Sequence, residues 1–250
     1  ITHAHTGHYP GLLYIGKETL NSNQLPLYCS KQMHKFLENN EPWGVMYRNQ
    51  NIKPIILNNN ISITLTTNLC ITPSLVPHRA DFTDTFAYSI SGPSREMFFC
   101  PDIDHWVVTD TDTYGSSSDS TSTSDSTSTS GSDTISNINN EMKQYLLHTI
   151  FIEKKDILLL DATFYDNHEL YNRDMSSIPH PRVVDTVQLI RENRNRNQNR
   201  EKNQKSSKSQ EVVLIHMNHS NRLWVEPQLV NSLYNECGIV VGRNGMIWYL

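Results

Sequence analysis

The middle of the chain consists of short runs in which apolar or β-branched residues alternate with polar ones. Runs of this kind, bounded by turn residues, predict β-strands. The strands expected in this region cover residues 25–30, 53–57, 61–67, 69–77, 85–92 and 95–101. The link "SGPSRE" between the last two is short and rich in turn residues, so it predicts a β-hairpin.

Helical patterns flank and follow these strands. We expect helices at residues 11–20, 30–40, 139–152, 181–190 and 227–238. Ser30 is placed to cap the second of these helices, and Gly238 to end the last. Further apolar strands are expected at residues 156–162, 211–216, 238–242 and 246–250. Strands followed by alternating helices and strands predict a single layered α+β domain over residues 1–250.

Two polar tracts interrupt this pattern. Residues 114–133 are almost entirely Ser, Thr, Asp and Gly, and residues 191–211 are mostly Asn, Gln, Lys and Arg. Neither tract can bury enough apolar surface to offset the entropy of ordering the chain, so we expect disordered insertions. The basic excess of the second tract leaves a nucleic-acid contact open, but a solvated loop is the simpler interpretation.

Composition narrows the classes of protein. The chain has 250 residues, 37% hydrophobic content and a net charge of −5, which suits one sizeable core and gives no general affinity for nucleic acid. The cysteines are far apart in sequence and form no CxxC, which disfavours a disulfide framework or a zinc knuckle and fits a reducing compartment. No apolar run approaches the roughly 20 residues of a membrane span. We therefore expect a cytoplasmic location and no membrane partner.

The strongest chemical signal is the opening stretch "ITHAHTGHYP", which holds His3, His5 and His8. In an extended segment His3 and His5 point the same way, because side chains alternate with a period of two. Imidazole nitrogen suits zinc, iron and similar metals. This spacing predicts metal ligands in preference to a merely polar terminus.

These residues also carry a resemblance. "THAHTGHYPGL" resembles the HxHxDH signature of the metallo-β-lactamase fold. More closely, it is similar to the HAHxGHYxGL variant of proteins like pyrroloquinoline-quinone (coenzyme PQQ) biosynthesis protein B. Gly7 stands where most of the superfamily has an aspartate that binds the second metal, and the quinone-biosynthesis-like branch has the same glycine. The resemblance extends in order over nearly the whole chain apart from the two polar tracts.

The resemblance assigns metal ligands from two segments that precede the first polar tract. In "LVPHRADF" it makes His78 the third ligand of a first metal, with His3 and His5. In "MFFCPDIDHW" it makes Asp102 the carboxylate that bridges two metals, with Asp104 as a rival or a supporting partner.

Two later segments complete the expected site. "LLLDATFYDNHEL", followed by His180, implies that Asp161 and His180 form a carboxylate–histidine pair for proton transfer. The alternative is that Asp161 caps the turn after the strand and His180 starts a helix. In "VVLIHMNHSNRL" a buried strand delivers His216, the last expected metal ligand. Residues that could contact substrate or support the ligands in this segment are Asn218, His219 and Asn221.

The resemblance implies a four-layer αβ/βα sandwich with metal at one edge. In that fold several strands precede the first histidine, so we expect the chain to be N-terminally incomplete. The first metal would lie among His3, His5 and His78, and the second position near His8, Asp102 and His216. Because Gly7 supplies no carboxylate, we expect one tightly bound metal and a weaker or empty second position.

Three functions compete. The first is a metal-dependent hydrolase that uses a metal-activated water on an ester, amide or phosphodiester. The second is an iron-dependent oxygenase or hydroxylase, as in quinone-cofactor biosynthesis, and the third is a non-catalytic binding protein on a metal scaffold. We expect one or two zinc ions, with iron or manganese as alternatives, and a small-molecule or nucleotide-type substrate. Nucleic acid is not the expected partner, and a homodimer is left open.

Overall fold

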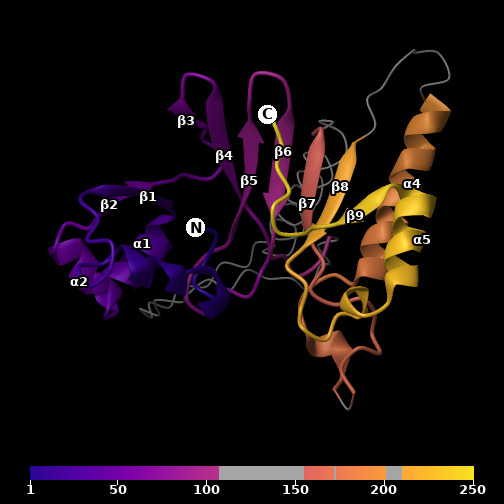
Figure 1. The fold of residues 1–250 in the computed structure, drawn as a ribbon, viewed down its shortest axis with the longest axis horizontal. Coiled ribbons are helices and arrows are strands. Elements are labelled where there is room, and N and C mark those ends of the chain that lie inside the picture. The colour runs from indigo at the N-terminus through magenta and orange to yellow at the C-terminus, as the bar shows by residue number, and fades with distance from the viewer. Residues whose placement is uncertain (107–154, 172, 201–209) are drawn as a thin grey trace, which may run out of the picture.

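The computed structural model describes residues 1–106, 155–171, 173–200 and 210–250. Within these ranges the strands form two sheets (Figure 1). The smaller sheet pairs two parallel strands, β1 (Leu25–Cys29) and β2 (Ile52–Ile56). The larger sheet has seven strands in sequence order, namely β3 (Ile63–Thr66), β4 (Leu69–Leu75), β5 (Phe86–Ser91), β6 (Glu96–Cys100), β7 (Ile157–Asp161), β8 (Glu211–Ile215) and β9 (Ile239–Val241).

Strand direction brings the carboxyl ends of several strands to one edge of the larger sheet. Strands β3 to β6 pair antiparallel in succession, whereas β6 to β9 are parallel to one another. Consequently β4, β6, β7 and β8 all run in the same direction, and their carboxyl ends lie at the same edge. The register keeps these ends level, because Cys100 pairs with Leu160 and Asp161 pairs with Ile215.

Four α-helices of the described residues lie outside the sheets. They are α1 (Lys31–Asn39), α2 (Trp43–Arg48), α4 (Val183–Arg200) and α5 (Pro227–Cys237). The Ser30 side chain accepts a hydrogen bond of 3.0 Å from the Met33 N–H, as an N-cap does, and α1 buries Met33 and Leu37 one turn apart. Short 3₁₀ helices cover Thr6–His8, Pro10–Ile15, Met175–Ser177 and Arg222–Trp224. None of the described helices is long and apolar enough to cross a membrane.

The apolar clusters define the order of the layers. Side chains of α1 and α2 pack with those of β1 and β2. On the other side of the small sheet, Tyr28 and Leu57 pack with Ile71 and Phe86 of the large sheet. The opposite face of the large sheet packs against α4 and α5 (Figure 1). The order is therefore helices, small sheet, large sheet, helices, which confirms the expected α+β fold.

The strand predictions from residue 25 to residue 101 are confirmed, as is the hairpin that joins β5 and β6. The strand expected at 246–250 is wrong. Trp248 and Leu250 pack on the face of the large sheet that lies away from α4 and α5, while Ile247 and Tyr249 are exposed. In an extended segment that packs across the face of a sheet, buried and exposed side chains alternate just as they do in a strand that pairs at the edge of the sheet.

The disordered insertion expected at 191–211 is wrong for residues 191–200, because α4 continues to Arg200. Arg191 and Arg194 anchor this part of the helix, donating hydrogen bonds to Glu236 and to the backbone oxygen of Cys237. The insertion expected at 114–133 and the helix expected at 139–152 lie outside the described residues.

Candidate metal centre

The candidate site is assembled at the edge where the parallel strands end. His78 follows β4, Asp102 follows β6, Asp161 ends β7 and His216 follows β8. Because these carboxyl ends are level, side chains far apart in sequence are delivered to one place.

Backbone contacts hold the N-terminal segment against the same edge. The Thr2 carbonyl accepts from the Phe86 N–H at 3.1 Å, and the Ala4 N–H donates to Thr83 Oγ1 at 3.0 Å. Both partners lie at or just before the start of β5, which runs opposite to β4 and β6 and so begins at this edge. The opening histidines are therefore placed beside the strand ends.

Three imidazoles form the first group. His5 Nδ1 lies 3.0 Å from His3 Nε2 and 3.1 Å from His78 Nε2. Burial, which outweighs the attraction of Asp102, lowers the pKa of His3 to about 2, and burial also lowers the pKa of His5. These two rings are therefore neutral near pH 7, the form in which imidazole binds metal.

The second nitrogen of each of these rings has its own polar partner. His5 Nε2 lies 3.1 Å from Asp81 Oδ2, and His78 Nδ1 lies 2.8 Å from Asp104 Oδ1. His3 Nδ1 contacts the Thr2 hydroxyl at 3.0 Å. Because a carboxylate only accepts, His5 and His78 carry their hydrogens on the outer nitrogens and turn lone pairs toward each other.

The second group consists of His8, Asp102 and His216. Asp102 Oδ2 lies 2.7 Å from His8 Nε2 and 3.4 Å from His216 Nε2, and these two nitrogens are 3.1 Å apart. The same oxygen is 3.4 Å from His3 Nε2, so Asp102 lies between the two groups. Burial raises the pKa of Asp102, but the His8 hydrogen bond and the neighbouring histidines outweigh this effect and hold it well below the usual value.

A third group lies behind Asp102. Asp161 is fully buried, and its Oδ2 is 2.7 Å from His180 Nδ1. Burial raises the pKa of Asp161, but the hydrogen bond from His180, the nearby His216 imidazole and the Thr163 hydroxyl outweigh burial and lower it overall. His180 and His216 have positive φ angles of 97° and 60°, which are uncommon outside glycine and mark a constrained backbone at functional sites.

Two observations show that this donor set suits a metal. With both rings neutral, the lone pairs of His5 Nδ1 and His78 Nε2 face each other at 3.1 Å with no hydrogen between them, an arrangement that a bound cation resolves. In addition, Asp102 Oδ1 is buried and has no hydrogen-bond partner among the described residues, although it is 3.3 Å from His180 Nδ1. Histidine and aspartate are common ligands of zinc, iron and manganese.

The structure thus brings together the expected ligands His3, His5, His8, His78, Asp102 and His216, and it pairs Asp161 with His180. Asp104 contacts the outer nitrogen of His78, so its place is that of the supporting partner and not of the rival bridge.

The residues expected to face substrate are placed differently. Asn221 is buried, its amide donates to the carbonyl of Ala162 at 2.7 Å, and its oxygen caps Leu223. Of the two roles expected for Asn221, these contacts fit the supporting one, because its polar groups are already used within the fold. The Asn218 amide donates to Ser220 at 2.6 Å, and His219 is exposed.

Two site residues were missed by the reasoning from sequence. Asp81 contacts His5, and the Thr163 hydroxyl contacts Asp161, His180 and His216. Thr163 was noted only as part of the "DATF" segment, and its position two residues after Asp161 was the available signal. Asp81 stands in a loop, where spacing alone does not indicate a contact.

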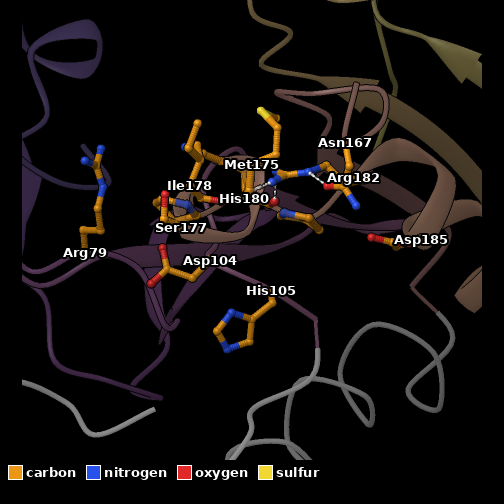
Figure 2. A pocket seen from close by; sticks show the side chains of 12 residues that line it. Arg79, Asp104, His105, Asn167, Met175, Ser177, Ile178, His180, Arg182 and Asp185 are labelled. Carbon is orange, nitrogen blue, oxygen red and sulfur yellow. Dashed lines mark hydrogen bonds between the residues drawn. The ribbon is translucent and has the colours of Figure 1, made fainter. Parts of the chain in front are cut away.

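A cavity of about 480 Å³ opens beside the third group. His180 and Asp104 line it, which connects it to the candidate metal centre (Figure 2). Figure 2 shows Arg79 and Asp185 on opposite sides of the opening, so the cavity carries both signs of charge. The Arg182 guanidinium in its wall is buried and donates to the carbonyl of His180 at 2.7 Å.

Known proteins share this fold. Residues 1–115 match the family of the beta-lactamase superfamily domain, and the chain has the metallo-β-lactamase fold with a histidine–aspartate cluster capable of holding a metal. None of the curated proteins compared with the chain matches its sequence.

Two solved structures share this fold. Zn(2+)-bound PqqB from Methylobacterium extorquens has 14% identity and a TM-score of 0.59, over 90% of this chain and 64% of that protein. Unliganded yeast PDE1 has 16% identity and a TM-score of 0.56, over 98% of this chain and 66% of that protein. The chain therefore spans about two thirds of the length of each neighbour.

Proposed function

We propose that the protein is a metal-dependent hydrolase acting on an ester, amide or phosphodiester. The observation that carries this proposal is that His5 Nδ1 lies 3.0 Å from His3 Nε2 and 3.1 Å from His78 Nε2, beside Asp102. A metal held there lowers the pKa of a bound water from about 15.7 to about 7 and so supplies hydroxide at neutral pH.

Asp161 and His180 are the proposed proton-transfer pair. The 2.7 Å contact places a hydrogen on His180 Nδ1, because the buried carboxylate accepts it, and leaves Nε2 as the nitrogen that exchanges a proton. His180 also lines the cavity, where a leaving group would be within reach. In this role Asp161 orients the ring and stabilises its imidazolium form, from which His180 Nε2 donates the proton to the leaving group.

The cavity supports a small-molecule or nucleotide-type substrate. Its volume of about 480 Å³ lies within the roughly 300–1,000 Å³ of small-ligand pockets. Arg79 follows the ligand His78 directly and is half exposed at the rim, where it can contact an anionic group of the substrate.

We propose one tightly bound zinc ion at His3, His5 and His78, with a weaker second position at His8, Asp102 and His216. Iron and manganese are the alternative metals. The mixed imidazole and carboxylate donor set suits iron as well as zinc. Bound iron would support an oxygenase or hydroxylase in place of a hydrolase.

Metal analysis and activity screening of the same preparation test the proposal. We expect about one zinc per chain and zinc-dependent turnover on an ester, amide or phosphodiester panel, with His5→Ala losing both. His216→Ala should lose turnover and keep the first metal. His34→Ala is the matched control, because His34 lies on α1 and pairs with Glu38 at 3.7 Å.

The outcomes separate the alternatives. Redox-active iron with oxygen-dependent turnover would replace the hydrolase by the oxygenase. Stoichiometric metal with no turnover on any substrate class would favour a binding protein on a metal scaffold.

A further inference from the structure

One threonine hydroxyl joins the proposed proton-transfer pair to a candidate metal ligand. Thr163 Oγ1 lies 2.6 Å from Asp161 Oδ1, 2.9 Å from His216 Nδ1 and 3.1 Å from His180 Nδ1. Thr163 itself is 8% exposed, so water does not readily replace these contacts. The hydroxyl has one hydrogen to donate and can accept two hydrogen bonds.

The surroundings of Asp161 determine where that hydrogen goes. Its Oδ1 accepts from the Thr163 N–H at 2.9 Å, and its Oδ2 accepts from the Ile103 N–H at 3.2 Å. Both oxygens therefore act as acceptors, and the short contact at Oδ1 requires the Thr163 hydroxyl to donate its hydrogen to the carboxylate. The same hydroxyl oxygen is then left as an acceptor for the imidazoles.

His216 must consequently donate from Nδ1 to Thr163. In the neutral ring, the form that binds metal, this places the hydrogen on Nδ1 and leaves Nε2 with a lone pair. Nε2 is the nitrogen that lies 3.4 Å from Asp102 Oδ2 and 3.1 Å from His8 Nε2, in the second metal position. The chain of donors runs from His216 through Thr163 to Asp161.

His216 differs in this respect from two other expected ligands. His5 and His78 each contact a carboxylate oxygen directly, at 3.1 Å and 2.8 Å. For His216 the corresponding oxygen, Asp161 Oδ1, is 3.9 Å from Nδ1, too far for a direct hydrogen bond. Thr163 bridges that gap.

We propose that Thr163 is a positioning residue: its hydroxyl fixes His216 in the Nδ1–H tautomer and so turns Nε2 toward the second metal position. One carboxylate thereby orients two imidazoles, His180 directly and His216 through Thr163. The inference rests on the proposed function in so far as it assigns His216 to a metal.

The full-length protein and three variants test this role. Thr163→Val removes the hydroxyl and keeps the volume, whereas Thr163→Ser keeps the hydroxyl. Thr85→Val is the matched control, because Thr85 is also buried but its hydroxyl has no hydrogen-bond partner among the described residues. Thermal unfolding of each variant shows whether it folds, and Thr163→Ala replaces the valine variant should that one not fold.

Two readouts are measured. Nitrogen-15 NMR of metal-free protein reports the tautomer of His216, and competition with a zinc chelator reports zinc affinity at the second position. We expect Nδ1–H in the wild type and in Thr163→Ser, and a mixture of tautomers in Thr163→Val. Zinc affinity at the second position should fall roughly 10- to 100-fold in Thr163→Val, be largely restored by serine and be unchanged in Thr85→Val.

The inference is overturned by an Nε2–H tautomer of His216 in the metal-free wild type. It is equally overturned by a Thr163→Val protein that keeps both the tautomer and the zinc affinity. A wild type with the expected tautomer and zinc but no hydrolytic turnover overturns the proposed function alone, so the two failures can be told apart.

Discussion

Gly7 lies between two histidines of the candidate centre and adds no side chain to it. A Cβ built at Gly7 meets no atom within 4 Å, and the residue does not have a positive φ, so larger side chains fit. We expect Gly7→Asp to add a carboxylate near the second metal position and to raise bound zinc from about one to about two ions per chain. Metal analysis after dialysis against limiting zinc would measure this.

Gly11→Asp serves as the control for added negative charge. A Cβ at Gly11 also meets open space, and its 3₁₀ helix lies outside the candidate centre. This variant should keep the wild-type stoichiometry. Two zinc ions in the wild type would contradict the single tight site, and one zinc in Gly7→Asp would show that the carboxylate does not reach it.

The order of motifs predicted the candidate metal ligands better than it predicted the residues that hold those ligands in place. Histidines and aspartates that follow apolar strands must meet when those strands are parallel and level, as Asp102 and His216 do. Asn221 also follows such a strand, but a polar side chain that caps a turn has the same sequence signal as one that faces a site. The role of Thr163 depends on where a single hydroxyl hydrogen points, which spacing cannot show.

At the scale of elements, Gly238 ends α5 in the left-handed conformation. Its φ and ψ are 59° and 28°, and its N–H donates to the Tyr234 carbonyl at 2.8 Å. A Cβ there would meet no atom within 4 Å, so a substitution costs only the free energy of holding a residue with a side chain in the left-handed conformation. We expect Gly238→Ala to lower the free energy of unfolding by roughly 1–2 kcal/mol, measured by urea denaturation.

Gly238→Asn should lower the free energy of unfolding by less, because asparagine tolerates this conformation better than alanine. Gly11→Ala is the control for loss of a glycine in open space without a positive φ. Equal losses in Gly238→Ala and Gly11→Ala would contradict the backbone explanation.

Elements with clear ends were predicted well, and those with ambiguous composition were not. Ser30 and Gly238 mark helix ends by local chemistry that does not depend on the rest of the fold. The stretch 191–200 is rich in Asn and Arg and reads as loop, yet contacts with the α5 terminus support it as helix. Residues 246–250 were misassigned because only the tertiary packing of Trp248 and Leu250 distinguishes them from a paired strand.

At the scale of the whole molecule, the candidate centre joins the N-terminal segment to the large sheet. A ligand that binds only the folded state stabilises it by about 2.7 kcal/mol at a hundred times its Kd. For a chain of this length we expect zinc to raise Tm by roughly 5–10 °C over chelator-treated protein. Thermal scans with and without zinc would measure this shift.

His5→Ala should show a much smaller zinc-dependent shift, while His34→Ala should behave like the wild type. The same Tm in zinc and in chelator would contradict metal binding by the folded chain. The two-sheet architecture behind this linkage was implied by the family resemblance, whereas the order of strands and helices predicted only a layered α+β domain. The packing of the C-terminal segment on the large sheet was not, because it depends on contacts distant in sequence.

The separation of the ligands along the chain has a consequence for biosynthesis. His8 and His216 face each other across 208 residues of sequence. His8 is translated before all of the described strands, whereas His216 emerges only after nearly all of them have been translated. The second metal position therefore cannot form before His216 has been translated, and its metal must be acquired after β8 has left the ribosome.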